Sequence, residues 1–168
     1  MPQKIVVTGA NGQLGSEIRQ IARTTPHVFA FTDIDTLDLT NQQEAHAFFG
    51  KNNPDIIVNC AAYTAVDKAE EEWEKAELIN AGIPAMLAEY GKRSGCKIIH
   101  ISTDYVFSGD LARPLTEEDT TGPMSRYGAS KVQGEQAIMQ YKNAMVIRTS
   151  WLYSSYGANF VKSMMRLL

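Results

Sequence analysis

The chain has 168 residues, 44% hydrophobic and 21% charged, a balance that indicates one globular domain with a real core and excludes a disordered segment. The net charge of −3 and the sequence pI of about 5.6 argue against a nucleic-acid surface, which would need a basic stripe. The cysteines, Cys60 and Cys96, border or lie in apolar runs, which favours reduced thiols and a cytoplasmic protein. There is no signal-peptide pattern and no apolar run of membrane-spanning length, so we expect no membrane contact.

The first elements are expected to be a buried strand at residues 5–7, a glycine-rich turn and a helix. Gly9, Gly12 and Gly15 would respectively permit a sharp bend, admit a pyrophosphate to backbone N–H groups, and let the helix pack against the strand. The N-terminus of that helix would favour phosphates. The pattern predicts dinucleotide binding, with an ordinary strand–helix turn as the alternative because the spacing is G-x-x-G-x-x-G.

An acidic residue follows the second strand, which we expect at residues 28–31. Asp33 lies at about the distance from the first glycine where a Rossmann fold places the acid that binds the adenosine ribose. A carboxylate there would bind the 2′-OH and repel a 2′-phosphate, and no Lys or Arg is adjacent in sequence. Asp33 could also be a simple turn residue. We predict that NADH is accepted at least as well as NADPH.

Apolar and helical segments alternate along the rest of the chain. The expected elements are a short third strand at 37–39, a helix capped by Thr40 or Asn41, a strand at 55–60, mostly helix at 67–94, a strand at 97–102, a loop at 108–124, a helix that holds 127–138, a strand at 144–147 and a helix from 159 to 168. This order predicts an α/β fold: a doubly wound parallel sheet of Rossmann type, strand order 3-2-1-4-5-6, in a three-layer α/β/α arrangement.

The small residues Ala61 and Ala62 follow the fourth strand, where such sheets leave room for a ligand. His100 lies within the fifth strand and is expected to be a packed histidine. The other histidines, His27 and His46, are isolated, so we expect no metal site built from them.

A tyrosine and a lysine lie four residues apart on one face of a predicted helix. Lys131 would lower the pKa of the Tyr127 phenol, whose reference value of about 10 is too high for easy proton transfer near neutrality. Thr103, at the end of the fifth strand, could hydrogen-bond the oxygen that Tyr127 protonates. The hydride must come from a cofactor, because no side chain can supply it. A surface Tyr–Lys pair is the alternative, but together with the glycine turn the pattern favours a reductase.

Several segments together resemble the dTDP-4-dehydrorhamnose reductase family of the extended short-chain dehydrogenase/reductase superfamily. The resemblance covers the whole chain, and its most specific parts are Ala-Val-Asp-Lys-Ala-Glu and Arg-Thr-Ser-Trp. The segments that carry it are 8–15, 59–70, 102–107, 127–131 and 148–153.

This resemblance implies reduction of the 4-keto group of dTDP-4-dehydro-L-rhamnose by NADH or NADPH, giving dTDP-L-rhamnose for bacterial surface polysaccharide. The implied catalytic residues are Thr103, Tyr127 and Lys131. The implied cofactor-binding residues are Gly9, Asn11, Gly12, Gln13, Leu14, Asp33, Asp38, Leu39, Ala61, Ala62, Tyr63, Tyr127 and Lys131. The implied substrate-binding residues are Val66, Asp104, Tyr105 and Trp151, although spacing alone fits a core aromatic at Trp151 equally well.

Family members continue beyond residue 168 into a smaller domain that grips the nucleotide sugar. We therefore expect residues 1–168 to form the NAD(P)-binding Rossmann domain alone. A homodimer is expected only of the full-length protein, and no metal site is expected in this chain. A sugar-nucleotide 4,6-dehydratase is disfavoured because Asp104 is followed by Tyr105 and not by Glu. Another nucleotide-sugar reductase or an epimerase, and a non-catalytic subunit like the β subunit of methionine adenosyltransferase, stay as alternatives.

Overall fold

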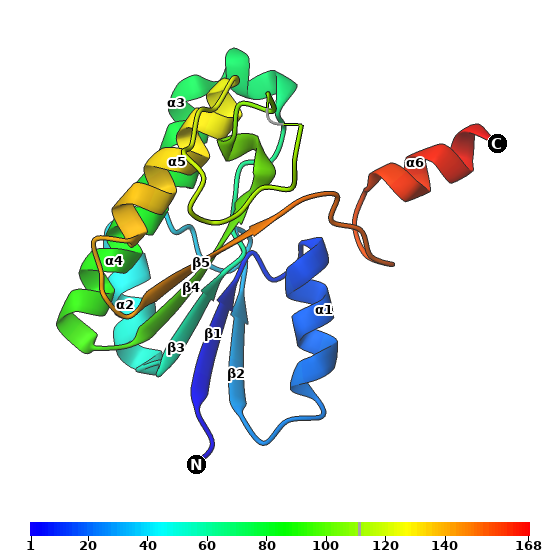
Figure 1. Cartoon of the computed structure of the whole chain (residues 1–168). Coiled ribbons are helices and arrows are strands. Elements are labelled where there is room, and N and C mark those ends of the chain that lie inside the picture. The colour runs from blue at the N-terminus through cyan, green and yellow to red at the C-terminus, as the bar shows by residue number, and fades with distance from the viewer. Residues whose placement is uncertain (111) are drawn as a thin grey trace.

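The computed structural model describes residues 1–110 and 112–168, so Leu111, in the expected loop, lies outside the described residues. Its strands form one parallel sheet in the order β2-β1-β3-β4-β5 (Figure 1). The strands are β1 (Lys4–Thr8), β2 (Val28–Thr32), β3 (Ile56–Asn59), β4 (Lys97–Thr103) and β5 (Ala144–Thr149). The α-helices are α1 (Gln13–Ala22), α2 (Gln42–Asn52), α3 (Trp73–Glu77), α4 (Ile83–Ser94), α5 (Arg126–Ile138) and α6 (Phe160–Leu167). Short 3₁₀ segments η1 (Asp67–Glu70) and η3 (Asp104–Val106) and a π-helical turn η2 (Leu78–Gly82) complete the elements.

Five of the six expected strands are present in the expected order, and the third one is wrong. Leu37 and Leu39 are buried, but their segment folds as turns. The backbone carbonyl of Asp33 accepts hydrogen bonds from the N–H groups of Thr36 and Leu37, and that of Asp38 accepts one from Asn41. The apolar pattern at 37–39 therefore anchors a loop on the core instead of adding a strand.

Local capping follows the expected chemistry. The side chain of Asn41, and not that of Thr40, caps α2 by accepting a hydrogen bond from the N–H of Glu44. At the other end Asn53 adopts the left-handed conformation, directly after the last residue of α2. These caps define the two ends of α2, the helix that connects β2 to β3 along the chain.

The main core lies between the sheet and one helical layer made of α2, α4 and α5 (Figure 1). The helices contribute Phe49 from α2, Leu87 from α4 and Ile138 from α5 to this core. The sheet contributes Ile57 from β3 and Ile98 from β4, whose side chains lie on the buried face of their strands. This layer holds α5, with its Tyr–Lys pair, firmly against the carboxyl ends of β4 and β5.

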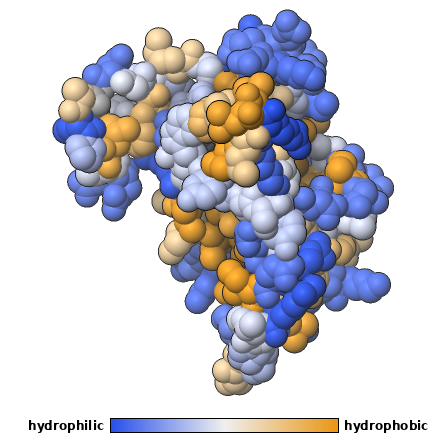
Figure 2. Space-filling view, turned by 90° about the vertical axis from the view of Figure 1, so that its right-hand side faces the viewer, coloured by the Kyte–Doolittle hydropathy of each residue, from blue (hydrophilic) through white to orange (hydrophobic). Residues whose placement is uncertain are grey.

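The opposite face of the sheet carries α1, which contacts β2, and is open over β5 within the described residues. Met145 and Ile147 are exposed there, and the strand register pairs them with Ile99 and Ile101 on β4. The last helix, α6, projects away from the sheet and buries none of its residues (Figure 1). Apolar side chains gather in places on the face shown in Figure 2, and α6 exposes Phe160, Met165 and Leu167. The three-layer arrangement is thus complete on one face and partial on the other.

Candidate active site

A cleft of about 930 Å³ lies along the carboxyl edge of the sheet, within the size range of cofactor sites. Its walls come from the turn after β1, the loops after β2 and β3, the end of β4, α5 and the segment after β5. Nearly all of the predicted site residues line it, namely Gly9, Asn11, Gly12, Gln13, Leu14, Asp33, Asp38, Leu39, Ala61, Ala62, Val66, Thr103, Asp104, Tyr105, Tyr127, Lys131 and Trp151.

The exception is Tyr63, which packs behind the cleft with Ala69, Ala76 and Tyr127. Its backbone is clamped by a residue that sequence reasoning missed. The Asn80 side chain accepts a hydrogen bond from the Tyr63 N–H at 2.9 Å and donates one to the Tyr63 carbonyl at 3.0 Å. It also donates to Ser130 Oγ on α5 at 3.0 Å. Asn80 therefore ties the loop after β3 to the helix that carries Tyr127, and a cofactor role for the Tyr63 side chain stays a prediction.

The glycine turn is built by close backbone approach. Gly9 has φ +63°, and a Cβ there would lie 2.6 Å from the backbone N of Ala61. A Cβ at Gly15 would lie 2.5 Å from Gly9 O, so this glycine lets α1 pack against the turn itself. Gly12 precedes α1, and no side chain of the described residues caps that N-terminus. The free N–H groups at the start of α1 are thus available to an anion at the cleft.

The Asp33 carboxylate is held rigidly beside this turn. Its Oδ2 accepts a hydrogen bond from the Asn11 N–H and its Oδ1 accepts one from the Ile34 N–H, both at 2.8 Å. Each oxygen keeps a further lone pair for a ribose hydroxyl. Among the residues that line the cleft, the charged side chains are Asp33, Asp38, Asp104 and Lys131. No cation of the described residues therefore lies on the cleft wall beside Asp33 to bind a 2′-phosphate.

Tyr127 is buried in the cleft wall, with the Tyr105 ring edge-on to it at 5.6 Å between centroids. Burial raises the pKa of the Tyr127 phenol, and the neighbouring Thr103 hydroxyl partly opposes this. The expectation that Lys131 lowers that pKa is wrong for this arrangement. The Lys131 ammonium is directed to the Ile101 carbonyl on β4, to which Nζ donates at 2.7 Å. The phenol is therefore held in its protonated form near neutrality.

Lys131 is only 2% exposed, and burial lowers its pKa to about 8. Its surroundings include a buried hydrogen-bonded row across the sheet that sequence reasoning did not connect. Thr8 Oγ1 donates to Asn59 Oδ1 at 2.7 Å, and Asn59 Nδ2 then donates to His100 Nδ1 at 2.9 Å. That direction assigns the His100 proton to Nε2. Burial lowers the His100 pKa to about 3, so this packed strand histidine is neutral beside Lys131.

Neither cysteine is poised as a nucleophile. Both thiols are free; Cys96 is buried and Cys60 is half-buried at the cleft. Burial raises the pKa of Cys60 to about 12, which keeps it a thiol. In the part of the chain that the structure describes, no group of three or more His, Cys, Asp or Glu residues is arranged to hold a metal ion. No helix among the same residues is both long and apolar enough to cross a bilayer.

Trp151 lies at the mouth of the cleft and is not a core aromatic. It is 73% exposed, has φ +52°, and packs its ring edge-on against Phe160 at 5.2 Å. A bulky residue with positive φ is an outlier of the kind that clusters at binding sites. Tyr105 is also exposed on the same cleft. The two aromatics give this end of the cleft an open, apolar rim.

Comparison with known proteins gives a consistent result. A family model described as RmlD substrate binding domain matches residues 3–168. The chain is 44% identical to a dTDP-4-dehydrorhamnose reductase of Sinorhizobium fredii, covering 98% of this chain and 55% of that protein. It is 40% identical to one of Escherichia coli, covering 97% and 56%. A crystal structure of a dTDP-4-dehydrorhamnose reductase from Bacillus anthracis in complex with NADP superposes with a TM-score of 0.95 at 40% identity, covering 99% of this chain and 60% of that one. The chain thus spans little more than half the length of these relatives.

Proposed function

This chain belongs to the RmlD substrate binding domain family, and on that basis we propose that it is the dinucleotide-binding part of a dTDP-4-dehydrorhamnose reductase. The observation that carries the proposal is the single cleft that joins the glycine turn, Asp33 and the trio Thr103, Tyr127 and Lys131. The relatives' names support the reaction and a nucleotide-sugar substrate. A cytoplasmic location and a homodimer of the full-length protein are part of the same proposal, the location because both cysteines are free thiols.

The residues at the turn fit a nicotinamide dinucleotide. Side chains at Gly9 and Gly15 would collide with the backbone that shapes the turn, and the uncapped start of α1 offers N–H groups to a pyrophosphate. Asp33 would hold the adenosine ribose, and Lys131 the nicotinamide ribose. NADH or NADPH, when bound, would supply the hydride to the C4 carbonyl carbon.

The chain's own groups would handle the proton. Tyr127 Oη would donate it to the carbonyl oxygen, so that the ketone becomes a secondary alcohol and the phenol a phenolate. A raised phenol pKa suits this role, because the group stays protonated until the oxyanion develops. The Thr103 hydroxyl, whose hydrogen bond favours the phenolate, would also orient the ketone. The exposed Tyr105 and Trp151 would face the sugar.

The test is Tyr127→Phe in the full-length protein that carries this chain, assayed with dTDP-4-dehydro-L-rhamnose by loss of reduced-nicotinamide absorbance. We expect kcat to fall about 10²–10⁴-fold, the usual worth of a general acid, while calorimetry shows unchanged dinucleotide binding. The exposed Tyr153→Phe is the matched control and should leave kcat unchanged. A wild type that turns over other 4-keto nucleotide sugars but not this one would refute the substrate assignment alone.

A further inference from the structure

The segment that links β5 to α6 runs back to the glycine-rich turn. Its residues 154–159, here called the strap, include Gly157 and Ala158, which line the cleft together with Gly12 and Gln13. Gly157 has φ +62°, and a Cβ there would lie 3.0 Å from Gln13 Cγ. In Figure 1 the same segment passes beside the first residues of α1. The strap therefore borders the end of the cleft where the N–H groups of α1 have no side-chain cap.

Two side-chain hydrogen bonds fasten the strap to one face of α1. Asn159 Nδ2 donates to Gln13 Oε1 at 3.0 Å, and Gln20 Nε2 donates to the Tyr156 hydroxyl at 2.8 Å. Gln13 and Gln20 are seven residues apart, which is about two turns of a helix, so they lie on the same face. Asn159 also donates to the Ser154 carbonyl at 2.9 Å and so closes the strap on itself. The strap is thereby held along α1.

A lysine of α6 orients the peptide groups of the strap. Lys162 Nζ donates to the Ser155 carbonyl at 2.6 Å and to the Gly157 carbonyl at 2.8 Å. The peptide bonds are trans, so the C=O and the N–H of one peptide group point in opposite directions. The Ala158 N–H therefore points away from Lys162, and none of the described residues accepts a hydrogen bond from it. Because Ala158 lines the cleft, this N–H is a donor available at the cleft wall.

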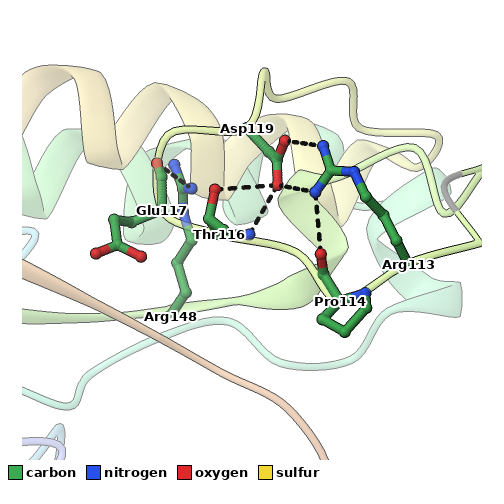
Figure 3. A network of polar contacts seen from close by, with 6 residues as sticks. All are labelled: Arg113, Pro114, Thr116, Glu117, Asp119 and Arg148. Carbon is green, nitrogen blue, oxygen red and sulfur yellow. Dashed lines mark hydrogen bonds and ion pairs between the residues drawn. The ribbon is translucent and has the colours of Figure 1, made fainter.

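Two arginines at the loop before α5 are committed to other partners (Figure 3). The Arg113 guanidinium donates to the Asp119 carboxylate at 3.0 Å. Arg148 donates to the Glu117 carbonyl at 3.4 Å and to the Glu135 carboxylate at 2.7 Å. Neither arginine is among the residues that line the cleft. A pyrophosphate in the cleft would therefore depend on N–H groups and not on these cations.

We propose that the strap is a second wall of the pyrophosphate site beside the start of α1, and that Asn159 and Tyr156 are positioning residues that hold it there. The Ala158 N–H and the first N–H groups of α1 donate to the pyrophosphate from the two walls. This rests on the proposed function only for the dinucleotide as ligand, because the sugar and its reduction play no part in it. A failed sugar assignment and a failed strap are therefore distinguishable by binding alone.

The experiment compares three probes on the full-length protein that carries this chain. NADH and ADP contain a pyrophosphate and adenosine does not. Asn159→Ser removes the Nδ2 donor but keeps a side-chain oxygen to cap α6, where Asn159 accepts from the Lys162 N–H at 3.0 Å. Tyr156→Phe removes the hydroxyl that Gln20 contacts. In each variant we expect the Kd of NADH and ADP, measured by calorimetry, to rise about fivefold, the usual net worth of one hydrogen bond. The Kd of adenosine, measured by NMR titration, should not change.

Tyr153→Phe and Ser163→Ala are the matched controls and should leave all three Kd values unchanged. Tyr153 is exposed and directly precedes the strap, and Ser163 Oγ donates to the Asn159 carbonyl at 3.1 Å. Unchanged binding of NADH and ADP in Asn159→Ser and Tyr156→Phe would overturn the proposal. An equal weakening of adenosine would also overturn it, because the variants would then loosen the whole cleft. A wild type that binds none of the probes would refute the dinucleotide assignment and the strap together.

Discussion

Replacing Gly9 with alanine should abolish dinucleotide binding and destabilise the fold. The loss of stability can be compared with that of alanine substitutions at other glycines of the chain. Gly9 has φ +63°, and its Cβ would lie 2.6 Å from the Ala61 N and the Cys60 carbonyl carbon, both backbone atoms. The left-handed backbone alone costs an L-residue about 1–2 kcal/mol. Overpacking adds about 1–3 kcal/mol, because neither backbone segment can yield like a flexible side chain.

Two matched variants separate those contributions. Gly95 has φ +79° with nothing within 4 Å of its Cβ position, so Gly95→Ala should show the backbone cost alone. Gly50 lies inside α2 with equally open space, and Gly50→Ala should stabilise the chain by about 0.5–1 kcal/mol. Denaturant unfolding of the three variants gives the free energies, and calorimetric titration with NADH gives binding. A Gly9→Ala cost no larger than that of Gly95→Ala, with NADH still bound, would refute the view that β1 and β3 must touch here.

Asp33→Ser should shift the binding preference from NADH toward NADPH, because the carboxylate that would repel a 2′-phosphate is removed. The substitution should also weaken the binding of both cofactors, because the Asn11 N–H loses its acceptor. An unchanged ratio of the two Kd values would contradict the ribose assignment. His100 has a folded pKa of about 3 against about 6.5 unfolded, so the unfolded chain binds more protons between these values and stability should rise with pH across that window. In His100→Asn the free energy of unfolding should no longer rise with pH across that window. A pH dependence of unfolding equal to that of the wild type would contradict the prediction. The 168-residue chain alone should bind NADH measurably by calorimetry yet reduce no 4-keto sugar at a useful rate; turnover equal to that of the full-length protein would show that these residues suffice.

The features that sequence reasoning predicted are those encoded locally. The glycine turn and the Tyr127/Lys131 pair each lie within about a dozen residues, and the alternation of strands and helices is periodic. The failed strand at 37–39 shows the limit, since a short apolar run fits a strand and an anchored turn equally well. Only the absence of a hydrogen-bonding partner strand among the described residues decides between them.

The features that sequence reasoning missed depend on contacts between distant segments. Asn80 reaches Ser130 fifty positions away, and Asn80 belongs to none of the motifs found in the sequence. Glu135 and Arg148 are closer in sequence, but nothing local shows that both turn inward. The direction of the Tyr127 pKa was also missed, because the spacing to Lys131 implied a cation beside the phenol. The Ile101 carbonyl, on another element, takes that ammonium instead.

The two ends of the cleft differ in how firmly the residues that line them are held in place. At the turn after β1, backbone hydrogen bonds fix Asp33 and glycines permit contacts that no other residue allows. At the opposite end Trp151 is exposed and strained, and α6 beyond it buries no residue. The Trp151 ring packs edge-on against Phe160 of α6. Binding energy from the nucleotide of the substrate would act at this open end, and it normally holds a ketone against the hydride and the proton donor. In the function proposed above, Thr103, Tyr127 and Lys131 would serve proton transfer, and Tyr105 and Trp151 at the rim would contact the sugar.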